Sequence, residues 1–156
     1  MAGWVVVING TSSSGKSTVV NSLRDLVVDE CWLATGIDVF LAMFPGTWFT
    51  APERPGPHGA AGFSFLPDGR GALIATPGPA GERLLAGYRR SVAAVAHAGN
   101  NVVVDEVMVG VNAWADWVDA LSGVNTLWVR VESGRGLHPT RAGSRRPADR
   151  SRPGPT

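Results

Sequence analysis

Eight consecutive residues near the amino end have the types and spacing needed to bind a chain of phosphates. The segment 10–17 reads Gly-Thr-Ser-Ser-Ser-Gly-Lys-Ser, in which four residues separate the two glycines and a lysine and a hydroxyl residue follow. Glycine lets successive backbone N–H groups turn toward phosphate oxygens, while the lysine ammonium reaches the outer phosphates and the last hydroxyl binds Mg²⁺. Arginine supplies every other basic side chain, so Lys16 is the single lysine of the chain. We therefore expect a site for ATP and Mg²⁺ made by Gly10, Thr11, Ser12, Ser13, Ser14, Gly15, Lys16, Ser17 and Thr18.

The segments on either side of this loop favour that interpretation over a chance glycine turn. Residues 4–8 form a continuous apolar run, typical of a parallel strand buried on both faces. From residue 15 to residue 28, apolar side chains recur at helical spacing, which predicts an amphipathic helix. The order of strand, glycine loop and helix is the one that a phosphate loop requires.

Asp38 is the candidate catalytic base, and Lys16 is the second catalytic candidate. Asp38 follows a short extended segment, residues 31–35, and precedes a short predicted helix over residues 39–44, so it lies where a strand ends. A carboxylate near a transferred phosphoryl group can accept the proton of an acceptor hydroxyl. Aspartate is equally suited to cap the amino end of a helix. The residues alone leave both interpretations open.

A second acidic pair follows a predicted strand over residues 101–105. Asp105 and Glu106 come after three consecutive valines, where a carboxylate commonly organises Mg²⁺ in phosphate-loop enzymes. A charge at such a strand end is also common as a solvated loop residue or a helix cap. We assign the metal to Ser17 and Asp105 and give Glu106 a weaker claim. The three histidines match no metal-ligand spacing.

Strands and helices alternate along the rest of the chain. Helical periodicity covers residues 82–98 and 112–121, and a further strand is predicted over residues 126–131. This order predicts an α/β fold of the P-loop NTPase type, with three layers, α/β/α, and a mostly parallel sheet. Ligands of such sheets bind beyond the carboxyl ends of the strands, which is where Asp38 and Asp105 fall.

A Pro- and Gly-rich insert, residues 46–81, follows Asp38. It contains a possible hairpin in which residues 63–65 and 72–75 flank a turn at residues 67–71. Four aromatic residues of the insert are candidates for the walls of an aromatic-substrate pocket: Trp48, Phe49, Phe63 and Phe65. Three other tryptophans have core-like spacing and are expected to pack in the core: Trp114, Trp117 and Trp128.

The 156 residues suffice for one domain, which we place at residues 1–132. That part carries eight basic and twelve acidic side chains, a mildly acidic balance that argues against nucleic acid as a partner. Residues 133–156 carry six arginines and one aspartate among Gly, Pro and Ser, so we expect a disordered tail. A single cysteine, Cys31, and the lack of a long apolar segment indicate a cytoplasmic protein without a membrane partner.

Four stretches occur together in this chain: the phosphate loop behind Val-Val-Val-Ile-Asn-Gly, residues 32–38 with Met-Phe-Pro at 43–45, residues 102–107, and residues 127–131. This combination resembles chloramphenicol phosphotransferase and its relatives, a family of the P-loop kinase superfamily, over residues 4–132. The resemblance implies transfer of the γ-phosphoryl group of ATP, with Mg²⁺, to the primary hydroxyl of chloramphenicol, which inactivates the antibiotic. It also implies that Asp38 is the general base and that the partner is a small-molecule hydroxyl acceptor.

The resemblance does not extend through the carboxyl-terminal part. Relatives continue with an arginine-bearing lid helix, further helices and a final strand, whereas residues 133–156 have neither helical periodicity nor apolar content. We therefore expect the lid and final strand to be lacking, and no lid role is carried over to Arg135, Arg141, Arg145 or Arg146. Two alternatives stay open: a nucleotide-binding relative without transferase activity, and a small-molecule kinase with a different acceptor.

Overall fold

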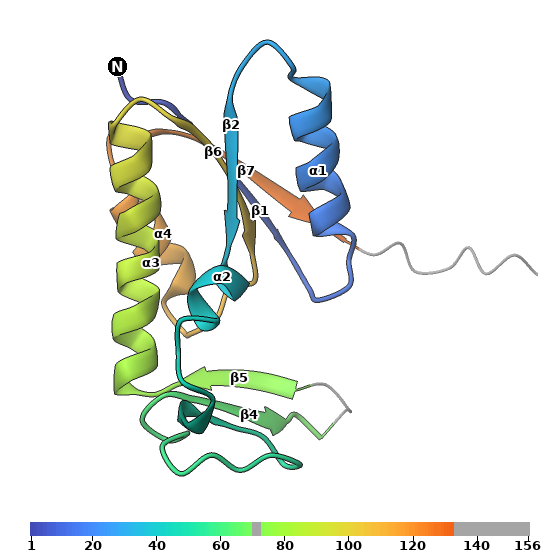
Figure 1. Cartoon of the computed structure of the whole chain (residues 1–156), viewed down its shortest axis with the longest axis vertical. Helices are drawn as coiled ribbons and strands as arrows, with labels where there is room; N and C mark the ends of the chain where they lie inside the picture. The colour runs from blue at the N-terminus through green and yellow to red at the C-terminus, as the bar shows by residue number, and fades with distance from the viewer. Residues whose placement is uncertain (70–72, 133–156) are drawn as a thin grey trace, which may run out of the picture.

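A four-stranded parallel sheet forms the centre of the computed structural model, which describes residues 1–69 and 73–132 (Figure 1). The strands lie in the spatial order β2 (Trp32–Gly36), β6 (Asn101–Glu106), β1 (Trp4–Gly10) and β7 (Asn125–Val131). Each neighbouring pair is parallel, so the four carboxyl ends meet at one edge of the sheet. This confirms the predicted parallel sheet and brings the segments after each strand together.

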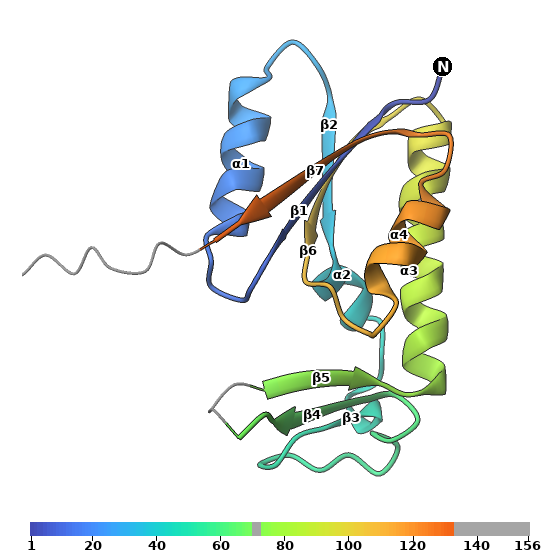
Figure 2. The ribbon, with the colours of Figure 1, turned by 180° about the vertical axis from the view of Figure 1, so that it is seen from behind.

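Helices cover both faces of this sheet and complete three layers. α1 (Lys16–Leu26) covers one face, whereas α3 (Pro79–His97) and α4 (Ala113–Ala120) cover the other (Figures 1 and 2). The short α2 (Ile37–Leu41) follows β2 directly and lies beyond the carboxyl edge of the sheet. The predicted α/β/α architecture of the P-loop NTPase type is thus confirmed. Within the described residues, no helix combines the length and the apolar character that a membrane span requires.

Alternating side chains of the central strands supply both halves of the core. Val5 and Val7 of β1 are fully buried in one cluster with side chains of α3 and α4. Val6 and Ile8, from the same strand, pack in a second cluster with Val20 of α1. Successive strand side chains point to opposite faces, so a strand buried on both faces must be apolar at every position. This requirement explains the uninterrupted apolar run that begins the chain.

A smaller sheet lies beyond the carboxyl edge of the first one (Figure 2). It consists of β3 (Phe49–Thr50), β4 (Phe63–Pro67) and β5 (Leu73–Pro77), and the 3-10 turn η1 (Gly46–Trp48) precedes β3. β4 and β5 are antiparallel, which confirms the hairpin predicted within the insert. Residues 70–72, which include part of its predicted turn, lie outside the described residues. So does the predicted tail over residues 133–156, with its arginines.

The aromatic side chains of the insert pack on one another. Phe44 makes edge contacts with Trp48, Phe49 and Phe63, with ring centroids 5.9, 6.0 and 5.6 Å apart. Phe49 also lies 6.2 Å from Phe65, and Phe63 is only 1% exposed. The prediction that these rings wall a substrate pocket is wrong for Phe63, because packing against the core already covers its ring.

The three tryptophans predicted for the core differ in their burial. Trp117 is completely buried, whereas Trp114 on the same helix is 55% exposed and lies against the half-buried Trp128, with centroids 4.4 Å apart. The prediction is confirmed for Trp117 and wrong for Trp114. Three residues advance a helix by about 300°, so Trp114 lies about 60° around α4 from Trp117 and outside the buried stripe.

Candidate active site

The predicted phosphate loop connects β1 to α1 at the carboxyl edge of the sheet. Gly15, the residue before α1, has a φ of 93°, a left-handed conformation that favours glycine. Gly10 is required for another reason, since a Cβ there would lie 2.5 Å from the carbonyl oxygen of Val131 and 2.8 Å from Ser14 Oγ. The two glycines therefore allow a tight turn that leads into the amino end of a helix, an arrangement suited to anions.

Polar groups inside this turn fit the phosphates of a nucleotide. Ser14 Oγ is buried and has no hydrogen-bond partner among the described groups. Lys16 is only 7% exposed, and its ammonium donates a hydrogen bond to the carbonyl oxygen of Thr11 at 2.8 Å. Buried polar groups ordinarily have partners, and a phosphate oxygen could accept hydrogen bonds from both the hydroxyl and the ammonium.

The two predicted metal residues meet at the carboxyl edge of the sheet. Ser17 donates a hydrogen bond to Asp105 Oδ2 at 2.8 Å, although the two residues are 88 positions apart in the chain. The Lys16 ammonium lies 3.8 Å from Asp105 Oδ1. Mg²⁺ prefers oxygen ligands and is usually held by one or two protein oxygens together with substrate phosphates. A hydroxyl and a carboxylate beside the phosphate loop therefore fit this metal.

The side-chain alternation of β6 explains why Asp105, and not Glu106, reaches Ser17. Asp105 shares a face of the strand with Val103, which packs in the cluster beneath α1. Glu106 shares the other face with Val102 and Val104, which pack with α3 and α4. Since Ser17 lies in the first turn of α1, only the first of the two carboxylates faces it.

Asp38 also lies near this site, through the register of the sheet. Gly36 at the end of β2 and Ile8 of β1 both pair with Asp105, one on each side of β6. The phosphate loop begins two residues beyond Ile8, and Asp38 stands two residues beyond Gly36. Because β2 and β1 are two strand spacings, about 10 Å, apart, the exposed Asp38 lies along the same short edge as the loop.

The interpretation of Asp38 as a helix cap is wrong. α2 begins at Ile37, so Gly36 occupies the cap position and Asp38 lies inside the first turn. Ile37 is 5% exposed, and burying its side chain draws the start of the helix two residues ahead of the predicted position. The aspartate is left without a capping role, whereas its suitability as a base is untouched.

Glu106 is a buried carboxylate, whereas the sequence had suggested a weak claim to the metal for it. It is 2% exposed, and Glu106 Oε2 accepts a hydrogen bond from Trp117 Nε1 at 3.1 Å. Burial raises the pKa of Glu106 to about 7, against opposing contributions from Tyr88, Arg89 and Trp117. The Tyr88 hydroxyl is buried without a hydrogen bond of good geometry. This burial is the main cause that raises the pKa of Tyr88, and the negative charge of Glu106 is the second. The alternation of Glu106 with two buried valines is the sequence signal that could have placed it inside.

Raising the pH should destabilise the fold through Glu106. The pKa of this group rises from 4.5 to about 7 on folding, so the folded state binds the proton more tightly. Its contribution is fully present below pH 4.5 and is lost as the pH rises through 7, a decline of about 3 kcal/mol. Urea unfolding of the wild type and Glu106→Gln, at pH 4.5 and pH 8 without nucleotide or divalent metal, measures this decline. Glu106→Gln should lack it, and parallel pH profiles for the two proteins would contradict the assignment.

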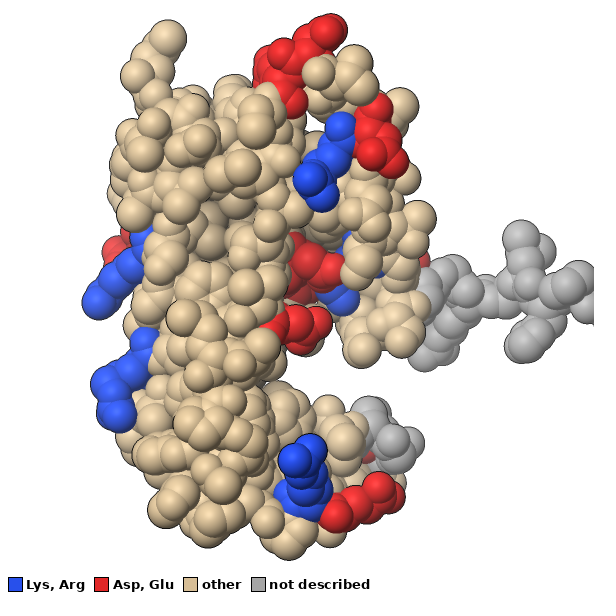
Figure 3. Space-filling model, viewed as in Figure 1, with Lys and Arg blue, Asp and Glu red and all other residues tan. Residues whose placement is uncertain are grey.

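The surface around the site is hollowed. On one side of the molecule a hollow opens between the hairpin layer and the layers above it, and acidic and basic side chains adjoin one another above the hollow (Figure 3). Lys16 and Asp105 are an oppositely charged pair at this edge of the sheet. The hollow therefore gives solvent, and any substrate, a route to the carboxyl ends of the strands.

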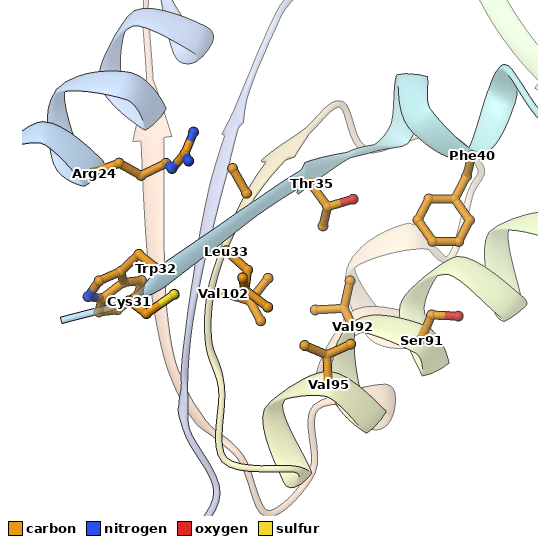
Figure 4. A pocket seen from close by; sticks show the side chains of 11 residues that line it. Arg24, Cys31, Trp32, Leu33, Thr35, Phe40, Ser91, Val92, Val95 and Val102 are labelled. Carbon is orange, nitrogen blue, oxygen red and sulfur yellow. The ribbon is translucent and has the colours of Figure 1, made fainter.

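A separate cavity of about 530 Å³ runs along β2 (Figure 4). Apolar side chains of β2 and α3, together with Phe40, make up most of its described wall, and Arg24 and Cys31 lie toward the amino end of β2. The described residues that line this cavity include no residue of the phosphate loop, and they include neither Asp38 nor Asp105. This cavity is thus distinct from the candidate active site.

Comparison with known proteins relates this chain to one family. Residues 3–152 match the profile of a family described as chloramphenicol phosphotransferase-like protein, so the match extends beyond residue 132, where the resemblance was expected to end. Two curated proteins of Mycobacterium tuberculosis, from strains CDC 1551 and H37Rv, are 32% identical to this chain over 122 residues. Both carry the provisional name of O-phosphotransferase. The match covers 76% of this chain and 51% of each relative, so the chain spans about half the length of the curated relatives it matches.

Solved structures share the fold at low sequence identity. The crystal structure of APE1195 superposes with a TM-score of 0.55 and 17% identity, covering 84% of this chain and 61% of that one. A chain of the Pnkp1/Rnl/Hen1 complex gives a TM-score of 0.54 and 14% identity, covering 90% of this chain and 43% of the other. At such identities the likeness concerns the arrangement of helices and strands.

Proposed function

The chain belongs to the chloramphenicol phosphotransferase-like family, and on that basis we propose that it transfers the γ-phosphoryl group of ATP to a hydroxyl of a small molecule. The acceptor that we favour is the primary hydroxyl of chloramphenicol. The observation that carries the proposal is the hydrogen bond of 2.8 Å from Ser17 to Asp105, with the Lys16 ammonium beside them. Because the proposed reaction consumes ATP, we also propose a cytoplasmic location for the protein.

Each part of the phosphate loop has a role in this reaction. The backbone N–H groups of residues 10–17 and the amino end of α1 would hold the phosphate chain. Lys16 would place its positive charge against the outer phosphates, and Ser17 and Asp105 would hold Mg²⁺. When bound, Mg²⁺ supplies positive charge that offsets the negative charge of the phosphate oxygens. The loop thus orients the phosphoryl group and lowers the repulsion that an incoming hydroxyl meets.

Asp38 would act on the other reactant. Its carboxylate accepts the proton of the acceptor hydroxyl while the acceptor oxygen bonds to the γ-phosphorus. The bond between that phosphorus and the oxygen bridging it to the β-phosphate breaks, and ADP leaves with the bonding electron pair. The proton then passes from Asp38 to solvent, which the exposure of this side chain permits.

Mass measurement of the acceptor tests the proposal directly. The 156-residue protein is incubated with ATP, Mg²⁺ and chloramphenicol, and the antibiotic should gain one phosphate group. Omitting Mg²⁺ by adding EDTA should stop the reaction. Phosphorylation of another hydroxyl compound alone would retain the activity and reject chloramphenicol. Tight ATP binding without a product from any acceptor would instead support a nucleotide-binding protein.

A further inference from the structure

β2 is an edge strand whose outer edge has no partner strand among the described residues. β6 pairs with one edge of β2, and no other described strand pairs with it. The free edge of β2 therefore presents backbone N–H and C=O groups that can bond to a further strand. Strands of a parallel sheet are ordinarily buried on both faces, yet Leu33 is 40% exposed and Ala34 is exposed as well. Both the backbone and the side chains of this strand are thus open to a partner.

The sequence of β2 contains no charge or proline that would hinder pairing at its edge. The strand reads Trp-Leu-Ala-Thr-Gly over residues 32–36, between Cys31 and Ile37. The strand at the opposite edge of the sheet, β7, differs, because its Arg130 side chain is 79% exposed and pairs with Glu132. Charged side chains on an edge strand discourage the addition of a further strand. One edge of the sheet is therefore protected, whereas the edge at β2 is not.

The cavity of about 530 Å³ along β2 reaches both faces of this strand (Figure 4). Arg24 of α1 lines it on one face with Trp32, which packs in the cluster beneath α1. Val92 and Val95 of α3 line it on the other face with Val102. Successive side chains of a strand point to opposite faces. A strand added beside β2 would place side chains in both parts of the cavity, whereas a compact small molecule would fill one part.

The residues of the two faces select the side chains of such a strand. Arg24 is the one charged residue among the described residues that line the cavity, and it forms no ion pair within the described part of the chain. Figure 4 shows its side chain extending from α1 toward β2. Asp25, Asp29 and Glu30 are near Arg24 in sequence but do not line the cavity. An acidic side chain therefore suits the α1 face, and apolar side chains suit the valines of the α3 face.

We propose that β2 binds an extended segment of another protein as an additional strand, with an acidic side chain toward Arg24 and apolar side chains toward α3. In this mode main-chain hydrogen bonds supply affinity, and pockets for alternate side chains supply specificity. The proposal goes beyond the proposed function, since the cavity contains none of the candidate active-site residues.

Two other occupants fit less well. A second copy of β2 offers no acid to Arg24, because residues 31–37 carry no charge. The segment 133–156 carries six arginines, and Leu137 is its one large aliphatic residue. Such a segment would bring positive charge to Arg24 and little apolar surface to α3. A strand from a different protein therefore matches the charge and the apolar character of the cavity better than either.

A synthetic peptide tests whether β2 accepts a strand. The probe is a short capped peptide in which valine alternates with threonine and the central threonine is replaced by glutamate. Its binding to the 156-residue protein is followed by the fluorescence anisotropy of a label on the peptide, and it should be saturable below about 1 mM peptide. Methylating the backbone nitrogens along one edge of the peptide removes its hydrogen bonds to β2, so this form should bind at least about tenfold more weakly.

Charge reversal at Arg24 tests the side-chain preference. Arg24→Glu should weaken binding of the glutamate probe about tenfold, because an attraction becomes a repulsion, and it should favour a probe with lysine in place of glutamate. A loss of stability would not reverse the preference in this way. Arg83→Glu is the matched control, since Arg83 is an exposed arginine of α3 outside the cavity. This variant should keep the preference of the wild type.

The two edge strands offer a second matched pair. Leu33→Asp places a charge on the α3 face of β2, where the valines of the probe would bury it, so binding should weaken at least about tenfold. Leu127→Asp, at a 52% exposed leucine of the opposite edge strand β7, should bind the probe as the wild type does. Thermal unfolding shows whether either variant harms the fold. The methylated peptide and the Arg24 reversal decide the matter even if Leu33→Asp does not fold.

Three results would each overturn the proposal: no binding of the probe to the wild type at about 1 mM, equal binding of the methylated peptide, or an unchanged preference in Arg24→Glu. Analytical ultracentrifugation covers the other occupant. If it shows a dimer that Leu33→Asp dissociates and that the probe does not displace, β2 is an interface between copies and the proposal fails. None of these measurements uses ATP or an acceptor, so their failure leaves the proposed function untouched.

Discussion

Replacement of Asp38 by asparagine is expected to lower the rate of phosphoryl transfer by about 10²- to 10⁴-fold, the range that a general base contributes. Asparagine keeps the size of the side chain but cannot accept the proton of the acceptor hydroxyl. Binding of Mg·ATP should change little, because the groups that would hold the phosphates lie on the loop between β1 and α1. The rate is followed by ADP release in the presence of chloramphenicol, and nucleotide binding is followed by calorimetry.

Asp29→Asn is the matched control for this variant. Asp29 is exposed in the connection between α1 and β2, at the amino end of that strand and away from the site. Its replacement removes the same charge without touching the carboxyl edge of the sheet. A wild-type rate in Asp38→Asn would refute the role of the base, whereas a loss of nucleotide binding would show that Asp38 acts on the metal.

Replacement of Lys16 by methionine is expected to weaken Mg·ATP binding by about 10- to 100-fold, the effect of losing one charged hydrogen bond to phosphate. The transfer rate should fall by a further factor of about 10² to 10³, because charge developing on the phosphoryl group loses its nearest cation. Methionine is similar to lysine in length and is flexible, so its side chain can occupy the space of the nearly buried lysine side chain. Calorimetry gives the binding constant and ADP release gives the rate.

Arg24→Met is the control for the lysine variant. Arg24 lies in the last turn of the same helix, α1, so its loss changes the net charge equally without affecting the loop. Thermal unfolding of both variants reports whether either substitution harms the fold. Wild-type affinity for Mg·ATP in Lys16→Met would remove the phosphate-loop assignment and, with it, the proposed function.

The phosphate loop could be predicted from the sequence almost in full, because every part of it is local. The apolar run of β1, the two glycines and the periodicity of α1 depend on residues close in the chain. The structure confirms this order of strand, turn and helix, and places Gly15 in the left-handed conformation expected of it. The boundaries of the elements moved by up to three residues, and the start of α2 moved because the burial of Ile37 outweighed local preference.

What the sequence by itself determined were the elements, the parallel α/β order and the residues able to do chemistry. Only the tertiary structure decided which of those residues meet. The hydrogen bond between Ser17 and Asp105, the burial of Glu106 against Trp117, and the cavity that β2 forms with α1 and α3 all join distant parts of the chain. Helices and turns are governed by neighbours in sequence, whereas these contacts depend on strand register and on which face each helix covers. Burial of apolar surface selects both of these, and it acts on the whole fold at once.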